Sequence, residues 1–383
     1  MKRLKVLLVT NIIPPYRIAL YEYIYQAEHF DLKLIALAEN EANREWQIAK
    51  DQIKINYRIL PGIHKFIRSR EITIHLNWGL GKAILRYKPD IVITSGYDTF
   101  AYWAAFLYCK LFKKKYILWN STTLLSTGRI NGFIGQIKQI IIRGADRYIT
   151  YGKKAAEYLT HMGASKEYIH SGINTVDMNW FRKKATELHQ DENLRKKRSR
   201  YPKLLMLYVG QLINRKGIYQ LLKALNELHD SNVGLLIVGS GPQGEELKQF
   251  CQDQKLENVY FEGFQQQEAL LRYYALADVL ILPSFKEVWG LVVNEALASG
   301  IYVLCSKYAG AAYDLIKEGW NGMLFDPHSI EELVILIQKA EEQIEDIRAR
   351  RDAISEHACH EFSIKRSAQA FSNAVEAVIS NKA

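Results

Sequence analysis

Short apolar segments alternate with helical segments twice along this chain of 383 residues, and this alternation restricts the possible folds more than any other feature. Residues 4–10 are mostly apolar, as expected for a parallel strand that is buried on both faces. Further strands are expected at residues 31–36, 89–94, 116–119 and 146–150, with helical segments between them. The first half of the chain therefore predicts a doubly wound α/β domain.

A polar segment, residues 176–203, interrupts the alternation and contains the basic run 195–200. Such runs usually form exposed linkers or solvated helix faces, so we place the domain junction here. The alternation restarts with strands at 204–209 and 233–238 and continues to a strand at 278–282. We expect an N-terminal domain, 1–180, and a second Rossmann-like domain, 181–363. Two such domains facing each other would leave a central cleft at the carboxyl ends of both sheets, where ligands bind in folds of this class.

The formal net charge of +10 makes phosphorylated substrates, polyanions and anionic lipid plausible partners. The four cysteines are scattered without a Cys-x-x-Cys pair, which argues against a zinc site or a disulfide framework. The N-terminal apolar run is too short for a signal peptide, and no apolar run reaches the roughly 18 residues of a spanning helix. We therefore expect a cytoplasmic protein.

Two glutamates eight positions apart, Glu287 and Glu295, flank the start of a predicted helix that ends at Gly300. If Glu295 lies on the helix and Glu287 just before it, they lie along one line about two turns long. The amide groups of a helix start are a natural phosphate site. One carboxylate could hold a sugar hydroxyl and the other a ribose hydroxyl, with a diphosphate between them. A solvated loop and an ordinary helix face would explain the same two residues.

Two loops after strands offer further candidates. Arg215 and Lys216 precede a helix, where they could neutralise a diphosphate and the charge that grows on it as it leaves; a solvated turn is the alternative. Residues 239–244 match the dinucleotide pattern G-x-G-x-x-G, and Glu262 closes the next strand. This match lies in the second domain, and a tight strand-to-helix turn explains its glycines equally well. A NAD-dependent oxidoreductase therefore remains an alternative.

In the first domain, residues 101–150 carry eight Lys or Arg against one acidic residue, Asp146, with aromatic and aliphatic residues interleaved. This composition suits a basic amphipathic surface on anionic lipid, although core helices with solvated basic edges would look the same. A non-catalytic membrane binder is thus a third possible function. Nucleic acid is not an expected partner, because no known binding module is present. The absence of an Asp-x-Asp pair favours a site without a metal ion, in which Arg215, Lys216 and helix N-termini neutralise the diphosphate.

Taken together, these segments resemble the family-4 retaining glycosyltransferases, which have the GT-B fold. The resemblance is strongest over residues 204–327. It rests on the loop 210–217, the turn 238–242, the pair Glu287 and Glu295, and the elements 310–316 and 321–325. It implies an N-terminal acceptor domain, a C-terminal nucleotide-sugar domain, and a final segment, 364–383, whose helix returns to the first domain.

Carried over by position, Glu287 would contact the donor sugar, with Arg215 and Lys216 as further catalytic residues. The implied nucleotide-sugar site comprises Gly210, Gln211, Gly239, Phe264, Trp289, Gly290, Leu291, Val292 and Glu295. The implied acceptor site comprises Tyr16, Arg17, Tyr97 and Asn120.

The chain departs from the family pattern at Gln211, where the family usually has Arg. It also departs at Asn120 and Ser121, which replace the His often found at the carboxyl end of a middle strand of the first domain. The first strand-to-helix loop also has 14–17, Pro-Pro-Tyr-Arg, in place of a glycine-rich sequence. The departures at Asn120 and in the first loop concern the acceptor and the detailed mechanism rather than the donor site. We expect a metal-independent enzyme that moves glucose or a related hexose from a UDP-sugar to a glycan or lipid-linked acceptor in polysaccharide biosynthesis. Peripheral association with the inner face of the cell membrane would accompany a lipid-linked acceptor.

Overall fold

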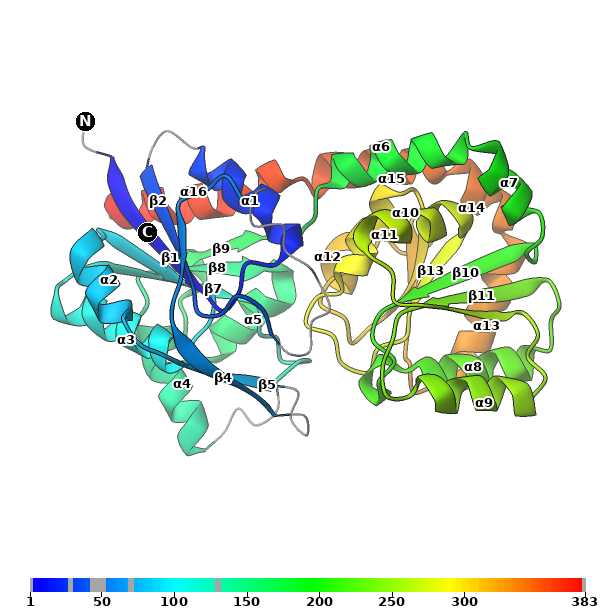
Figure 1. Ribbon diagram of the computed structural model, residues 1–383, viewed down its shortest axis with the longest axis horizontal. Helices are drawn as coiled ribbons and strands as arrows, with labels where there is room; N and C mark the ends of the chain where they lie inside the picture. The colour runs from blue at the N-terminus through cyan, green and yellow to red at the C-terminus, as the bar shows by residue number, and fades with distance from the viewer. Residues whose placement is uncertain (1–2, 27–29, 42–52, 68–71, 128–131, 381–383) are drawn as a thin grey trace. The chain divides into compact units, whose positions relative to one another are not determined.

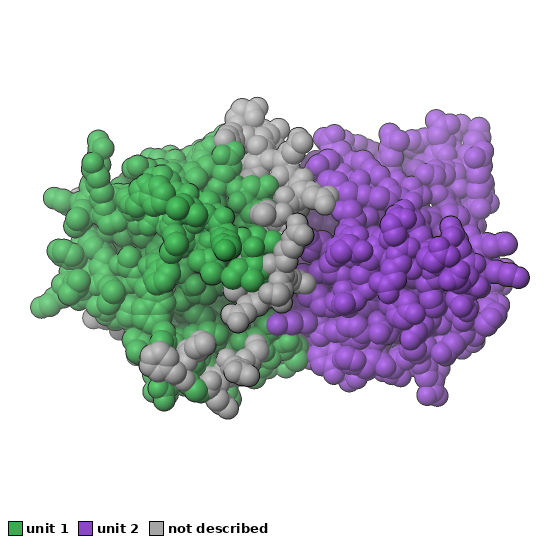
Figure 2. Space-filling view, turned by 60° about the horizontal axis from the view of Figure 1, so that its bottom comes forward, with its two compact units in different colours: residues 1–176, 364–383 green, residues 177–363 purple. Residues whose placement is uncertain are grey.

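The computed structural model describes residues 3–26, 30–41, 53–67, 72–127 and 132–380. The chain forms two compact units, 1–176 together with 364–383, and 177–363, which Figure 2 colours separately. The expected boundary at 180 lies slightly too late, because Asp177 already belongs to the second unit. Its side chain accepts a hydrogen bond from the Trp180 amide at 3.1 Å and so caps a helix, α6 (Met178–His189), that packs within that unit.

The first unit contains a seven-stranded parallel sheet in the order β3-β2-β1-β6-β7-β8-β9. Its strands are β1 (Leu4–Thr10), β2 (Phe30–Ala36), β3 (Tyr57–Ile59), β6 (Ile91–Thr94), β7 (Lys115–Asn120), β8 (Arg147–Tyr151) and β9 (Ile169–Gly172). Its helices are α1 (Pro15–Tyr25), α2 (Leu80–Tyr87), α3 (Phe100–Leu111), α4 (Phe133–Gly144), α5 (Gly152–His161) and α16 (Ile364–Ser380). Figure 1 shows α1 and α16 on one face of the sheet and α2, α3 and α4 on the other. This two-sided cover explains why the central strands are apolar throughout.

An antiparallel hairpin of β4 (Gly62–Ile67) and β5 (Ile72–Asn77) interrupts the parallel pattern of the first unit and was not expected. The Asn77 side chain donates a hydrogen bond of 2.6 Å to the Leu37 carbonyl just after β2. On β5, His75 is buried whereas Ile74 and Leu76 are 40% and 46% exposed. The polar face of this strand is therefore the inner one.

The second unit contains a six-stranded parallel sheet in the order β12-β11-β10-β13-β14-β15. Its strands are β10 (Leu204–Val209), β11 (Val233–Val238), β12 (Val259–Gly263), β13 (Val279–Leu282), β14 (Tyr302–Ser306) and β15 (Gly322–Phe325). Its helices, besides α6, are α7 (Glu192–Arg198), α8 (Ile218–Leu228), α9 (Gly244–Asp253), α10 (Gln267–Leu276), α11 (Leu291–Ala298), α12 (Ala312–Leu315), α13 (Ile330–Glu342), α14 (Ile344–Ala349) and α15 (Arg351–Glu361). The two parallel sheets confirm the expected fold class of two Rossmann-like domains.

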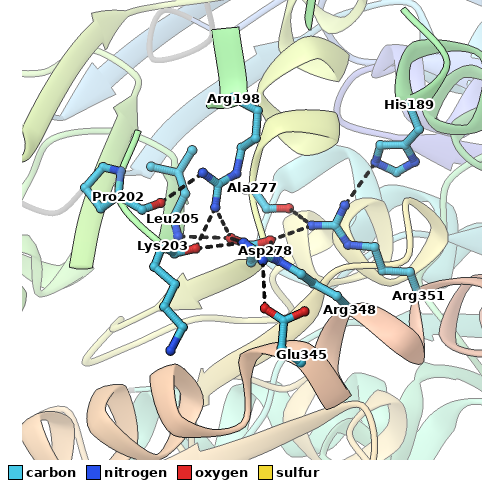
Figure 3. A network of polar contacts seen from close by, with 10 residues as sticks. All are labelled: His189, Arg198, Pro202, Lys203, Leu205, Ala277, Asp278, Glu345, Arg348 and Arg351. Carbon is cyan, nitrogen blue, oxygen red and sulfur yellow. Dashed lines mark hydrogen bonds and ion pairs between the residues drawn. The ribbon is translucent and has the colours of Figure 1, made fainter. Parts of the chain in front are cut away.

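The polar segment 176–203 is not a linker, because it forms α6 and α7 of the second unit. Figure 3 shows how α7 is anchored: the Asp278 carboxylate, just before β13, lies among three arginines. Arg198, Arg348 and Arg351 approach it at 2.6, 3.0 and 2.8 Å, and the Leu205 amide adds a hydrogen bond of 3.1 Å. Burial alone would raise the pKa of Asp278, but the arginines hold it below its usual value. The network joins α7, α14 and α15 to the sheet.

None of the helices in the described part of the chain combines the length and the apolar character that a membrane crossing requires.

Candidate functional site

Glu287 lies in the loop after β13 and is fixed to the loop after β14. Its amide donates a hydrogen bond to the Tyr308 carbonyl at 3.2 Å, and its carbonyl accepts one from the Gly310 amide at 3.2 Å. The ammonium group of Lys216 contacts its carboxylate, and a guanidinium nitrogen of Arg215 lies 3.9 Å away. The side chains of Glu287 and Lys216 are only 15% and 13% exposed. Two cations therefore meet one carboxylate at the carboxyl edge of the sheet, as residues of one site would.

A glycine brings the two cations to this carboxylate. Arg215 and Lys216 lie on a 3₁₀ turn, Asn214–Lys216, that ends at Gly217 with φ +70°. A Cβ atom on Gly217 would lie 2.0 Å from the Pro283 carbonyl oxygen, so only glycine lets the turn pack against the end of β13. The Phe285 amide then donates a hydrogen bond of 2.9 Å to the Arg215 carbonyl. Loops far apart in the sequence are thus held together by the backbone.

Helix α11 starts immediately beyond Glu287. The residue that precedes it, the N-cap Gly290, has φ +97°, and a Cβ atom there would lie 2.8 Å from the Leu282 side chain. Leu291 and Val292 follow half-buried in the first turn, where helix amide groups lack carbonyl partners within the helix. Trp289 differs from the expectation, because its indole is 3% exposed and donates a hydrogen bond of 2.9 Å to the Asn294 side chain. Its side chain belongs to the core, so only its backbone could contact a ligand.

Glu295 lies on α11, as expected, but it has a partner of its own. The Tyr274 hydroxyl on α10 donates a hydrogen bond of 2.6 Å to its carboxylate. Burial raises the pKa of Glu295 to about 7, although the hydrogen bond from Tyr274 opposes that rise. Glu287 and Glu295 are thus held by different residues and in different electrostatic surroundings, one beside cations and one beside a phenol. No local sequence pattern indicated that Tyr274 would contact Glu295.

Gly210 and Gly239 lie where the loops after β10 and β11 touch. A Cβ atom on Gly239 would lie 1.8 Å from the Gly210 carbonyl oxygen, and one on Gly241 would lie 2.5 Å from the Leu212 carbonyl oxygen. Contact between the two loops therefore explains why positions 239 and 241 are glycines, and no bound dinucleotide is needed to explain them. The Gln211 carbonyl accepts a hydrogen bond of 2.8 Å from the buried Tyr208 hydroxyl, which fixes this loop.

Phe264 follows β12 and Gly263, and it is 39% exposed. It comes from the loop that follows the third strand of the unit, whereas Gly210 and Gly239 follow the first two. Parallel neighbouring strands end at the same edge of a sheet, so all three residues lie along one edge. An exposed aromatic ring at that edge is compatible with stacking on a base.

The residues expected to bind an acceptor are largely buried. Tyr97 donates or accepts a 2.8 Å hydrogen bond with the Tyr158 hydroxyl, and the Asn120 amide donates one of 2.9 Å to the Thr122 carbonyl. The guanidinium of Arg17 lies over the Trp119 ring, 4.6 Å from its centroid, and also near Tyr16 at 5.6 Å. Arg17 is therefore a buried, stacked cation rather than a surface side chain. Their assignment to an acceptor stays a prediction.

A polar cluster at the carboxyl edge of the first sheet was missed. Asn11, directly after β1, donates a hydrogen bond of 2.7 Å to the Glu41 carboxylate, and the buried His75 ring lies 3.4 Å from the same oxygen. A ring nitrogen of His64 lies 3.0 Å from His75, and burial together with the neighbouring His75 lowers the pKa of His64. The inverted polarity of β5 was the available signal for this cluster.

Comparisons with known proteins agree with this arrangement. Residues 189–359, most of the second unit, match the family model described as Glycosyl transferases group 1. Among curated proteins, a glycosyltransferase of Methanocaldococcus jannaschii is 31% identical over 169 residues, which are 42% of this chain and 40% of the relative. The sulfoquinovosyl transferase of Arabidopsis thaliana is 31% identical over 148 residues, 38% of this chain and 28% of the relative. The matches thus span well under two thirds of the length of these relatives.

Solved structures match the whole chain. HepE of Anabaena in complex with UDP has a TM-score of 0.74 at 18% identity and covers 98% of this chain and 100% of its own. A glycosyltransferase of Rickettsia africae has a TM-score of 0.75 at 16% identity and covers 100% of both chains. The fold is therefore GT-B. Residues 189–359 are thus similar to group 1 glycosyltransferases, and the solved structures establish the fold.

Proposed function

We propose that this chain is a retaining glycosyltransferase of family 4 that transfers a hexose from a UDP-sugar. The observation that carries the proposal is the contact of Lys216 with the Glu287 carboxylate directly before the start of α11. The two cations would balance the charge of the diphosphate of a nucleotide-sugar, and the amides of the helix start would donate hydrogen bonds to it. The carboxylate would accept hydrogen bonds from the sugar hydroxyls. HepE, which has a similar fold, has been solved in complex with UDP and glucose, and this supports the proposed donor.

In the proposed reaction, Arg215, Lys216 and the amides of Gly290 and Leu291 bind the diphosphate. The bond between the anomeric carbon and the phosphate oxygen breaks, and the acceptor oxygen attacks from the same face. The acceptor hydroxyl gives its proton to the departing phosphate oxygen. Glu287 orients the hexose and Glu295 the ribose, so that catalysis rests on positioning and on stabilisation of the leaving group. In this proposal, protein groups rather than a metal ion neutralise the charge of the leaving diphosphate.

The acceptor is proposed to be a growing glycan or a lipid-linked glycan, as in polysaccharide biosynthesis at the cytoplasmic face of a membrane. The first unit supplies its binding site. The Asn11, Glu41 and His75 cluster supports this assignment, since it offers both donors and acceptors of hydrogen bonds to sugar hydroxyls at the carboxyl edge of the first sheet.

The test is turnover of a panel of UDP- and GDP-hexoses, measured as nucleotide release in the presence of EDTA. Release of UDP from at least one UDP-hexose, and its loss in Glu287→Gln, supports the proposal. Binding of NAD with no affinity for any nucleotide-sugar would favour the oxidoreductase instead. The loop contacts of Gly239 and Gly241 give a reason for these glycines that does not require that alternative.

A further inference from the structure

Helix α3 has apolar side chains on both of its faces. Its inner residues, among them Tyr102, Phe106 and Cys109, are buried in the core of the first unit. On the opposite face, Phe100, Leu107 and Leu111 are 70%, 52% and 77% exposed. With Ala104 they recur at intervals of three and four residues and form one stripe, which we name the α3 outer face. A surface helix of a globular domain normally has a polar outer face, so this stripe is suited to an apolar environment.

Other exposed apolar side chains lie on elements that pack around the same core. They are Phe112 at the end of α3, Leu85 on α2 and Ile140 on α4, which are 56%, 53% and 58% exposed. The inner residues of α2, α3 and α4 belong to one hydrophobic cluster. Figure 1 shows these three helices on the same side of the sheet. Exposed apolar side chains on this side of the sheet are therefore not confined to α3.

The charge of the three helices has one sign. Residues 80–87, 100–111 and 133–144 contain no Asp or Glu. Exposed cations on or directly after these helices are Lys82, Arg86, Lys88, Lys110, Lys113 and Arg143. Two other lysines of the region are ion-paired, Lys114 with Asp90 at 3.3 Å and Lys115 with Asp146 at 3.2 Å. The basic surface is therefore centred on α2 and the end of α3 rather than on the run 113–115 as a whole.

We propose that the α3 outer face inserts shallowly into the surface of an anionic membrane. Its apolar side chains would enter the boundary between headgroups and acyl chains, and the cations around it would contact anionic headgroups. A second copy of this chain is a poorer occupant, because two such faces would bring like charges together. The proposal extends the electrostatic binding expected from the sequence by adding insertion of apolar residues. It complements the proposed function, since it would bring the first unit to a lipid-linked acceptor.

The experiment is flotation of the full chain with phosphatidylcholine vesicles that contain either none or about one third phosphatidylglycerol. Binding to the anionic vesicles alone is expected. The double substitution Leu107→Gln and Leu111→Gln should raise the lipid concentration for half-maximal binding about tenfold, because it removes apolar area and leaves every charge in place. The matched control is Ile335→Gln, which changes a 53% exposed side chain on α13 of the second unit and should leave binding unchanged.

A second pair of variants tests the charges. Lys110→Gln with Lys113→Gln should weaken binding and reduce its dependence on salt. Lys196→Gln with Lys197→Gln removes the same charge from α7 in the second unit and should have no effect on the vesicle binding. All these side chains are exposed, so the thermal unfolding midpoint and the affinity for UDP should stay at wild-type values. Loss of vesicle binding with intact UDP binding then concerns this surface alone.

A fluorescent label reports insertion directly. The four native cysteines are buried, so an environment-sensitive fluorophore on Leu107→Cys labels one site selectively. Its emission should shift to the blue with anionic vesicles, and that of the same label on Ile335→Cys should not. Wild-type binding by the Leu107 and Leu111 variant would overturn the proposal, as would no binding to anionic vesicles at low salt. A blue shift that grows with protein concentration in the absence of lipid would identify a second copy as the occupant and would also overturn it.

Discussion

The Lys216 ammonium group contacts the Glu287 carboxylate across 71 positions of sequence. Each residue of this ion pair belongs to a loop that follows a strand, and each loop is fixed by backbone hydrogen bonds of its own. Because the pair is mostly buried, its charges interact more strongly than those of a surface ion pair. In the proposed reaction, the diphosphate competes with Glu287 for Lys216, and the carboxylate then accepts hydrogen bonds from the hexose.

Glu287→Gln should lower kcat by roughly 10²-fold or more, the scale of losing one group that stabilises the transition state. The amide keeps the shape of the side chain but loses the charge that orients the sugar and balances the cations. Initial rates of UDP release from the active UDP-hexose measure the effect. A rate close to that of the wild type would remove Glu287 from the catalytic residues.

Lys216→Ala and Arg215→Ala should each reduce kcat by about 10²-fold, because each removes positive charge from the leaving diphosphate. The matched control is Lys286→Ala, which removes an exposed lysine next to Glu287 in the same loop. That variant should retain the wild-type rate. Equal losses in all three variants would mean that the net charge of the loop, rather than these two side chains, controls the rate.

The pKa of about 7 at Glu295 predicts two opposite pH effects. Ribose hydroxyls donate to the ionised carboxylate, so the affinity for UDP should rise about tenfold between pH 6 and 8 from this group. Stability should fall over the range from about 4.5 to 7, because the unfolded chain releases this proton at lower pH than the folded chain. Glu295→Gln should remove both effects while leaving the ionisation of UDP itself unchanged. Titration calorimetry and thermal unfolding at several pH values measure them, and identical pH profiles in the variant and wild type would contradict the assignment.

Asp278→Asn should destabilise the second unit by about 3–5 kcal/mol. The neutral amide would leave three arginines without their buried negative partner. The control is Glu345→Gln, which removes an 80% exposed partner of Arg348 and should cost at most about 1 kcal/mol. The lowered pKa of Asp278 means that its stabilisation is present above its unfolded value of 3.8 and is lost as pH falls through the folded value. The difference in unfolding midpoint between wild type and Asp278→Asn should therefore shrink at strongly acidic pH.

The fold could be predicted where apolar runs meet clear boundaries. Three strands, β1, β10 and β11, have the bounds expected from the sequence, because each is a run of buried apolar residues that ends at Asn11, Gly210 or Gly239. The hairpin of β4 and β5 could not be assigned in this way, since β5 buries His75 and exposes Ile74 and Leu76. The polar segment 176–203 contains the start of the second unit, as expected, and most of its basic run lies on the solvated helix α7. The anchoring of α7 could not be predicted, because Arg198 contacts a carboxylate that is buried and distant in sequence.

The candidate site could be predicted as a set of residues but not as a set of contacts. Glu287, Lys216 and Arg215 follow from the sequence, and the structure brings them together. The Tyr274 hydroxyl on Glu295 and the burial of Trp289 depend on packing between separate helices and loops, which no local pattern encodes. The contacts of Asn120 could not be predicted either, because its side chain donates hydrogen bonds to the carbonyls of Thr122 and of Ala155, which lies on α5.

Retaining hexosyl transfer from a nucleotide-sugar at the Glu287 site can be observed by proton NMR with an α-linked UDP-hexose as the donor. The enzyme is incubated with the donor and EDTA, and the anomeric signal of the first-formed product is followed together with UDP. We expect release of UDP and an α-anomeric product, both lost in Glu287→Gln. A β-anomeric product, or turnover that is unchanged in Glu287→Gln, would contradict this expectation.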